Sequence, residues 1–144
     1  CHYGNLKDIL LGGDELVFLC HPKHAFAGRT VSAGQLNGEP FLFREGGSAG
    51  RDLVESTLKA SGVETRPLWQ SISTQTLISG VAEGLGMAVL PLSLIQPALS
   101  TARVSQFRVE GIQFTRRFRL LYHRNKYLTR PMETMIQLCQ ESWR

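Results

Sequence analysis

Short runs of β-favouring residues alternate along this chain with longer segments of helical spacing, and this alternation constrains the fold more than any other feature. Buried or alternating apolar runs predict strands at 15–20, 40–43, 66–72, 87–90, 104–109 and 114–123. Apolar residues at helical spacing predict helices at 49–60, from Ser73 or Thr74 to Gly84, at 92–100 and from Pro131 onward. Strands that alternate with helices of this length are typical of βαβ units. The chain is therefore expected to be an α/β protein with a largely parallel sheet.

Turn residues and apolar stripes set the expected ends of these elements. Gly12-Gly13-Asp14 predicts a turn before the first strand, and Gly62 predicts the end of the first long helix. Ser32 is expected to cap one helical turn that runs to Leu36. The expected core stripe of the terminal helix consists of Met132, Met135, Ile136 and Cys139.

Length and composition favour a soluble, intracellular globular chain. The 144 residues, of which 42% are apolar and 19% charged, are enough for one domain or two small lobes with a buried core. No apolar run is long enough to cross a membrane, and no secretory leader opens the sequence. The first residue is Cys1 rather than Met, which suggests a fragment.

Positive charge is concentrated in the last third of the chain. Residues 1–100 hold 7 Lys or Arg and 9 Asp or Glu, for a net −2, whereas residues 101–144 hold 9 and 3, for a net +6. These basic residues fall on a predicted strand and the turn after it, rather than on a helix that could enter a groove of DNA. They are interpreted as a solvated face, and direct DNA contact is not expected from this segment.

Cysteine and histidine do not form a recognisable metal or disulfide pattern. Cys1, Cys20 and Cys139 are an odd number of cysteines without a CxxC pair. Cys20 and His21 would point to opposite faces of a continuing strand, and no second cluster of ligands follows His24. We expect a buried thiol, two loop histidines and no metal or other cofactor.

The pentapeptide Gly46–Gly50 matches G-x-S-x-G, the nucleophile elbow of α/β-hydrolases, because a predicted strand precedes it and a helix follows. A serine hydrolase with Ser48 as nucleophile would need an acid and then a histidine later in the chain, which Glu64 or Glu83 followed by His123 would supply. His123 is the only histidine after Ser48, and the chain is short for a hydrolase sheet. This activity is an alternative and not the main prediction.

The same serine also fits a binding site. Backbone N–H groups at the start of a helix, together with hydroxyl groups, can hold an anion. Ser48 has this position before one predicted helix, and Ser73 and Thr74 repeat it before the next. In parallel α/β folds, both helix starts lie at the edge where ligands bind. The alternative is that these residues only cap their helices.

Four stretches of the sequence resemble the effector-binding domain of LysR-type transcriptional regulators. Residues 23–27 (Lys-His-Ala-Phe-Ala) resemble the family's HPLA step, and residues 40–51 match its strand, Gly-Ser turn and helix. Residues 81–91 are similar to its V-x-x-G-x-G-[apolar]-[small]-x-[apolar]-P stretch. Residues 117–131 resemble the sulfur-metabolism branch of the family. The order and spacing of these stretches carry the resemblance over nearly the whole chain.

This resemblance implies a two-lobed fold like that of type II periplasmic binding proteins, with a small effector between the lobes. Residues 40–112 would form the second lobe, and residues 1–39 and 113–144 the remaining part of an incomplete first lobe. Arg44 and Glu45 would lie near the crossing between the lobes. The residues implied in effector binding are Arg44, Ser48, Ser71, Ser73 and Thr74.

The resemblance also implies what the whole protein does. It would be a cytoplasmic transcription regulator without catalytic activity, which binds a small and anionic metabolite and associates as a dimer or tetramer. DNA would be bound only through an N-terminal winged helix-turn-helix, which these residues do not contain; no membrane contact is implied. A fragment of a periplasmic solute-binding protein would have the same fold, and it is a second alternative.

Overall fold

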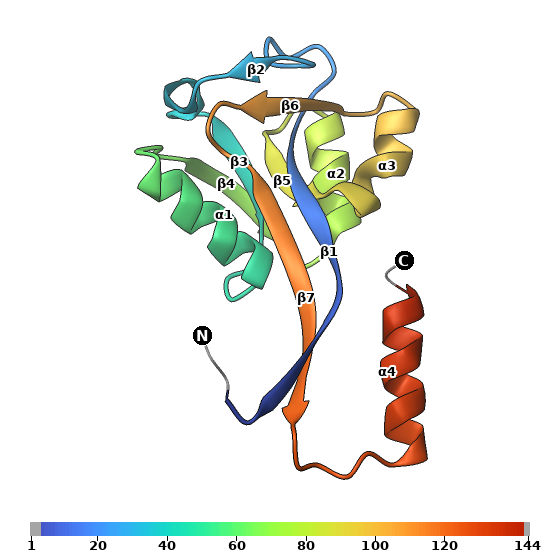
Figure 1. Cartoon of the computed structure of the whole chain (residues 1–144). Coiled ribbons are helices and arrows are strands. Elements are labelled where there is room, and N and C mark those ends of the chain that lie inside the picture. Colours follow the sequence, from blue (N-terminus) through green and yellow to red (C-terminus); the bar gives the residue numbers. More distant parts are fainter. Residues whose placement is uncertain (1–3, 143–144) are drawn as a thin grey trace. The chain divides into compact units, whose positions relative to one another are not determined.

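The computed structural model describes residues 4–142. Contacts divide the chain into two units, Glu15–Phe114 and Cys1–Asp14 with Thr115–Arg144, and each unit is described by itself. In chain order the elements (Figure 1) are β1 (Leu6–Cys20), β2 (Thr30–Val31), the short 3₁₀ helix η1 (Ala33–Leu36), β3 (Pro40–Arg44), α1 (Ala49–Ala60), β4 (Arg66–Ser71), α2 (Thr74–Ala82), β5 (Ala88–Pro91), α3 (Leu92–Ser100), β6 (Ser105–Val109), β7 (Phe114–His123) and α4 (Arg130–Ser142).

The larger unit is an α/β structure with a mixed sheet, which confirms the predicted class. The end of β1 is antiparallel to both β5 and β6, whereas β2 is parallel to β6 and β3 is parallel to β4. Two hydrogen bonds of 2.8 Å, from Leu42 N to Met87 O and from Met87 N to Pro40 O, join β3 to the residue that directly precedes β5. The parallel pair β3–β4 is joined by α1, as the sequence predicts for a strand–helix–strand unit, whereas no strand was predicted at β2.

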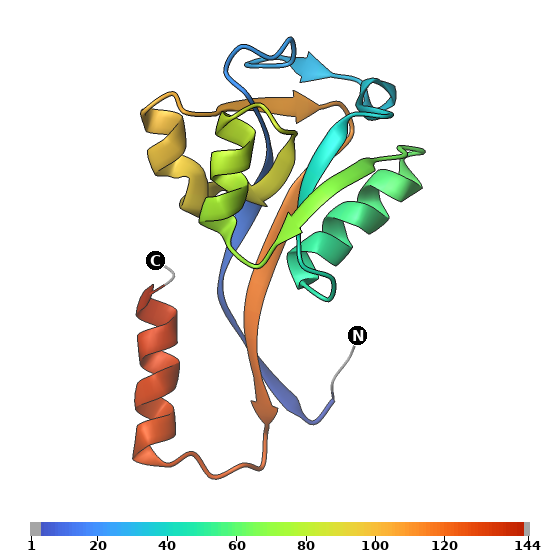
Figure 2. The same ribbon diagram turned by 180° about the vertical axis from the view of Figure 1, so that it is seen from behind.

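The last five residues of β1 are buried on both faces of the sheet. Phe18 packs in one apolar cluster with Val54 and Leu58 of α1, whereas Leu19 packs in a second cluster with residues of α2 and α3. Successive strand residues point to opposite faces, so a strand covered on both sides is continuously apolar. Figure 2 shows α1 on one side of the strands and α2 with α3 on the other.

Gly86 has a packing role at the point where α2 leads into β5. A Cβ atom at this position would lie 2.8 Å from the backbone oxygen of Pro40, so only glycine allows the two backbones to come this close. This contact lies next to the hydrogen bonds that hold Met87 against β3.

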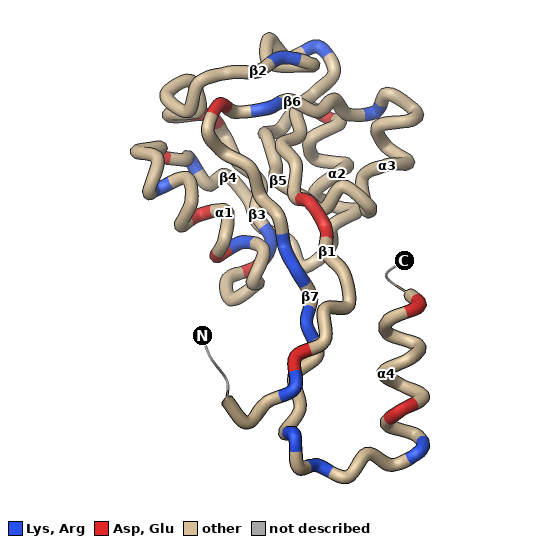
Figure 3. The backbone as a smooth tube through the Cα atoms, viewed as in Figure 1, with Lys and Arg blue, Asp and Glu red and all other residues tan. Residues whose placement is uncertain are grey.

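In the smaller unit, β7 pairs with β1, and two ion pairs hold the ribbon together. Arg116 Nε donates to Asp14 Oδ1 at 2.8 Å, and Arg119 Nη1 donates to Asp8 Oδ2 at 2.6 Å. Figure 3 shows the basic residues that gather along β7. The prediction of a turn at residues 12–14 was wrong, because β1 continues through these residues. A Cβ atom at Gly13 would lie 2.5 Å from the carbonyl oxygen of Arg116, so the glycine allows the neighbouring strand to come close.

Helix α4 has the predicted position but not the predicted core stripe. No described residue of this helix is buried, and Met135 is 66% exposed. Met132, Ile136 and Cys139 are half-buried. The prediction was wrong because helical spacing of apolar residues reveals an amphipathic helix but not whether another surface covers it.

The division into two units places residues 15–39 with 40–114, because β1 and β2 pair with β5 and β6. The predicted lobe boundaries at 39/40 and 112/113 therefore differ from this division, and the lobe assignment stays a prediction.

Within residues 4–142, no helix is long and apolar enough to span a membrane. Cys1 lies outside the described residues.

Candidate functional site

The strands β3 and β4 end at the same edge of the larger unit. They are parallel, and their last residues, Arg44 and Ser71, are partners in the register. A short loop leads from β3 to α1, and residues 72 and 73 lead from β4 to α2. Both helices therefore begin at this edge, where their N-terminal N–H groups favour negative charge.

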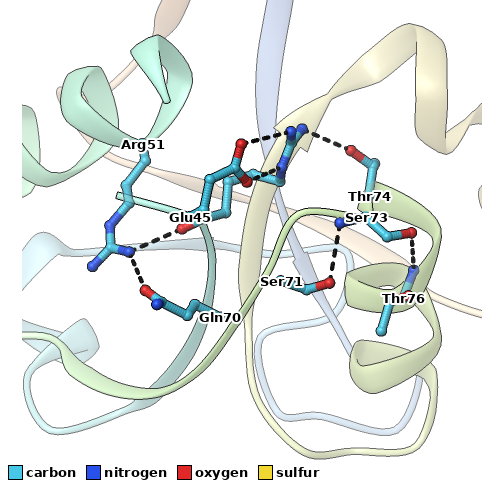
Figure 4. Close-up of polar contacts among 8 residues, drawn as sticks. Glu45, Arg51, Gln70, Ser71, Ser73, Thr74 and Thr76 are labelled. Carbon is cyan, nitrogen blue, oxygen red and sulfur yellow. Dashed lines mark hydrogen bonds and ion pairs between the residues drawn. The ribbon is translucent and has the colours of Figure 1, made fainter. Parts of the chain in front are cut away.

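The side chain of Arg44 is held by two residues, Glu45 in the loop after β3 and Thr74 at the start of α2, and both of these partners are labelled in Figure 4. Its Nη1 donates to Thr74 Oγ1 at 3.1 Å, at the first residue of α2. Its Nε and Nη2 donate to the two carboxylate oxygens of Glu45 at 3.0 and 3.3 Å. These hydrogen bonds from Arg44 lower the pKa of the Glu45 carboxyl from its usual value. The guanidinium side chain is 32% exposed, so solvent and solutes reach it.

Two serines cap the chain where β4 passes into α2. The Ser71 hydroxyl accepts a hydrogen bond from the backbone N–H of Ser73 at 3.0 Å, and the Ser73 hydroxyl accepts one from the N–H of Thr76 at 3.3 Å (Figure 4). A hydroxyl that accepts such a bond still has its own hydrogen to donate. Both serines can therefore cap the backbone and donate to an anion at the same time.

Ser48 stands before α1 but does not cap it with its side chain. Its backbone is extended, with φ −66° and ψ 128°, and its hydroxyl makes no capping hydrogen bond. The preceding Gly47 has φ +88°, a left-handed conformation that glycine adopts readily and that turns the chain into the helix. The Ser48 hydroxyl is thus available to a ligand, but no hydrogen bond links it to the Arg44 group.

Arg51, in the first turn of α1, contacts the ends of both strands and was not predicted as a site residue. Its Nη1 donates to the carbonyl oxygen of Arg44 at 2.9 Å and to Gln70 Oε1 at 2.6 Å. Its Nε donates to Glu55 at 3.0 Å, and its guanidinium lies 5.2 Å from the centroid of the Phe43 ring. Only 17% of this side chain is exposed. Arg51 therefore ties α1 to the ends of β3 and β4.

The structure brings four of the five predicted residues together, namely Arg44, Ser71, Ser73 and Thr74. Ser48 directly precedes the neighbouring helix α1 at the same edge. A sequence signal for Arg51 did exist, since it is a cation three residues after the predicted cap Ser48, but spacing alone does not show that it would turn toward Phe43 and Gln70.

The residues that the sequence offers as acid and base of a hydrolase do not lie beside Ser48 within one unit of the structure. Glu64 follows α1 and Glu83 caps the C-terminal end of α2, so both lie at the ends of these helices opposite the candidate site. The 12 residues of α1 separate its two ends by about 18 Å. His123 belongs to the other unit, and its Nδ1 accepts a hydrogen bond from the N–H of Asn125.

The cysteine and histidines near the end of β1 serve local structure. His21 Nδ1 accepts from Lys23 N, and His24 Nδ1 accepts from Phe26 N, both at 3.0 Å. Cys20 is fully buried, and burial raises the pKa of its thiol to about 11. Residues 4–142 contain no cluster of three or more His, Cys, Asp or Glu that could hold a metal ion.

Comparison with known proteins defines the class to which this fold and site belong. Residues 3–144 match the LysR substrate binding domain. The chain is therefore a member of the LysR substrate-binding domain family, as its sequence motifs predict.

Curated relatives are transcriptional regulators. The RuBisCO operon transcriptional regulator of Allochromatium vinosum is 34% identical over 115 residues, which cover 79% of this chain and 38% of that protein. The regulator CbbR of Rhodospirillum rubrum is 30% identical over 108 residues, which cover 75% of this chain and 36% of that protein. The chain thus spans less than half the length of these relatives.

A solved structure supports the fold assignment. The regulatory domain of CcmR from Synechocystis PCC6803, in complex with 2-PG, superposes with a TM-score of 0.85 at 20% identity and covers 97% of this chain and 68% of that one. This similarity confirms an α/β fold of the regulatory-domain type.

Proposed function

We propose that this chain is the effector-sensing part of a LysR-type transcriptional regulator and that it binds a small anion at the edge where β3 and β4 end. Arg44, Ser48, Ser71, Ser73 and Thr74 would contact the anion. The whole protein would act in the cytoplasm as a dimer or tetramer, without catalysis, and would bind DNA through an N-terminal domain outside this segment. Effector binding would shift the population between two arrangements of the oligomer.

The convergence of Arg44 with the start of α2 carries this proposal. The guanidinium supplies fixed donors that suit carboxylate or phosphate oxygens. Thr74 holds one end of that guanidinium at 3.1 Å, and Ser71 and Ser73 cap the adjacent backbone. Charge, hydroxyl groups and helix N-terminus therefore meet at one place, as an anion site requires.

The chemical class of the effector is open to a direct screen. The resemblance of residues 117–131 suggests sulfur metabolism, whereas one relative regulates a RuBisCO operon and the CcmR domain holds 2-PG. The screen therefore includes sulfate, thiosulfate, O-acetylserine, 2-PG, dicarboxylates and aromatic acids. A ligand at 100 times its Kd stabilises the folded state by about 2.7 kcal/mol, which raises Tm by several degrees.

Substitution of Arg44 tests the site once a binding anion is found. We expect Arg44→Gln to weaken binding about ten- to hundredfold in calorimetric titration, because it removes charge-assisted hydrogen bonds. Arg66→Gln is the matched control, since Arg66 is an exposed arginine at the start of β4 and its loss changes net charge equally. Equal effects of the two variants would contradict the proposed site.

Ser48 is tested separately because it makes no contact with the Arg44 group. Ser48→Ala is expected to weaken binding of the same anion, with Ser56→Ala on the exposed side of α1 as the control. An unchanged Kd for Ser48→Ala would remove this residue from the site without affecting the role of Arg44.

A further inference from the structure

The guanidinium proposed to bind the effector is already occupied by a carboxylate of the same chain. Arg44 Nε and Nη2 hold the two oxygens of Glu45 at 3.0 and 3.3 Å, while Nη1 holds Thr74. We propose that Glu45 is an internal anion that occupies Arg44 in the absence of effector, and that an effector binds by displacing the Glu45 carboxylate. This inference rests on the proposed function of Arg44.

The contact has the geometry by which arginine recognises an anionic ligand. Two parallel N–H groups face two oxygens, which is the bidentate arrangement that carboxylates and phosphates adopt on arginine. The Glu45 oxygens therefore occupy the position that two oxygens of an effector would need.

Glu45 is placed so that it can leave. It belongs to the loop between β3 and α1 and is followed by two glycines, which permit a wide range of backbone conformations. Its side chain is 39% exposed, and exposed ion pairs hold weakly. Moving the carboxylate into water leaves Arg44 still held by Thr74.

Arg51 provides the contrast within the same site. It also has a glutamate partner, Glu55, but its other donors hold the Arg44 carbonyl and Gln70, and its side chain is only 17% exposed. Its glutamate is on the same helix rather than on the loop. Arg51 therefore has a structural role, whereas the anion held by Arg44 can be exchanged for another.

Displacement of a carboxylate selects a class of ligand. A lone monocarboxylate would only replace one carboxylate by another, without a gain in charge. A doubly charged oxyanion adds electrostatic attraction and has further oxygens for the hydroxyls of Ser73 and Thr74. The site is thus expected to favour phosphate-type anions or dicarboxylates over monocarboxylates.

Titration of the full chain with inorganic phosphate at constant ionic strength tests this inference, with Glu45→Gln compared against Glu55→Gln. Both variants remove one negative charge from a glutamate that pairs with an arginine 3.0 Å away. We expect Glu45→Gln to bind phosphate about two- to fivefold more tightly than the wild type, as loss of a competing exposed ion pair implies. Glu55→Gln is expected to change the Kd by less than about twofold, since its partner Arg51 is not the arginine proposed to bind the anion.

The outcomes separate this inference from the proposed function. Equal affinities of the wild type and Glu45→Gln, or equal gains in both Gln variants, would overturn the role of Glu45 while Arg44-dependent binding remained. If neither the wild type nor Glu45→Gln binds phosphate, the anion site itself is wrong and this inference fails with it. Glu45→Asp gives a second test: the shorter side chain keeps the charge but cannot reach both nitrogens, so phosphate should bind with intermediate affinity.

Discussion

Ser48 and Ser73 each stand directly before a helix, yet their hydroxyls are in different situations. Ser73 Oγ accepts a hydrogen bond from Thr76 N at 3.3 Å, whereas the Ser48 hydroxyl makes no capping bond to α1. Both helices have a backbone bond at their start, from Asp52 N to Ser48 O at 3.0 Å in α1 and from Leu77 N to Ser73 O at 3.2 Å in α2, so only the side-chain bond differs. A capping role and a ligand role are therefore separable in this pair of residues.

The pair gives a matched prediction for stability. Ser73→Ala should lower the free energy of unfolding by about 1 kcal/mol, the usual effect of losing a side-chain cap. Ser48→Ala should leave it within about 0.5 kcal/mol, as for a surface substitution away from such features. Urea denaturation followed by circular dichroism measures both. Equal losses in the two variants would show that the Ser48 hydroxyl also caps its helix in solution.

Residue identities predicted much of the candidate site, and the limits of that prediction have a physical cause. Ser73 and Thr74 could be found because caps follow local rules that depend on the next few residues. Arg51 could not be found in this way, since its role depends on Gln70 and Phe43, which belong to other elements. Likewise, Glu45 was placed near Arg44 by sequence, but the ion pair between them is a matter of side-chain conformation.

At the scale of elements, the helix limits agreed best with the sequence. Helices α1 and α3 begin and end where predicted, at 49–60 and 92–100, because glycine, proline and capping residues mark their ends. The start of β1 was missed by nine residues, since none of residues 6–14 of this strand is buried and they lack the long apolar run of its end. Strand direction was also beyond local pattern, because pairing of β1 with β5 and β6 depends on distant partners.

Arg51 connects three elements, and its replacement by lysine tests that connection. Arg51→Lys keeps the charge but has a single nitrogen, which cannot stand at the position of Nε beside Glu55 and of Nη1 beside Gln70 and the Arg44 carbonyl at once. We expect the free energy of unfolding to fall by about 1–3 kcal/mol, the range for hydrogen bonds that involve a charged group. Urea denaturation measures this loss.

The control for Arg51 is the same change at an exposed arginine. Arg66→Lys, at the start of β4, should alter stability by less than about 0.5 kcal/mol. Comparable losses in the two variants would mean that Arg51 acts only through its charge and does not fasten α1 to the strand ends.

At the scale of the whole molecule, the buried core belongs to one unit. Every buried apolar residue in the described part of the chain lies between Leu16 and Phe114. These residues form two clusters, and Cys20, at the end of β1, is in the cluster that α1 covers. The state of this core controls global unfolding, so a titratable group inside it links stability to pH.

Cys20 gives that linkage a defined sign and range. Burial raises the pKa of its thiol from 9.0 to about 11, so between these values the unfolded chain releases the proton and the folded chain keeps it. Stability is therefore unaffected by this group below about pH 9 and falls as the pH rises toward 11, by about 2 kcal/mol. Cys20→Ala should remove this part of the decline. In urea denaturation at intervals from pH 8 to 10.5, the unfolding free energy of the wild type should therefore fall relative to that of the variant as the pH rises.

Cys139→Ala, at a half-buried position on α4, is the control and should keep the wild-type pH dependence. Parallel curves for wild type and Cys20→Ala would show that the thiol reaches solvent before the core unfolds.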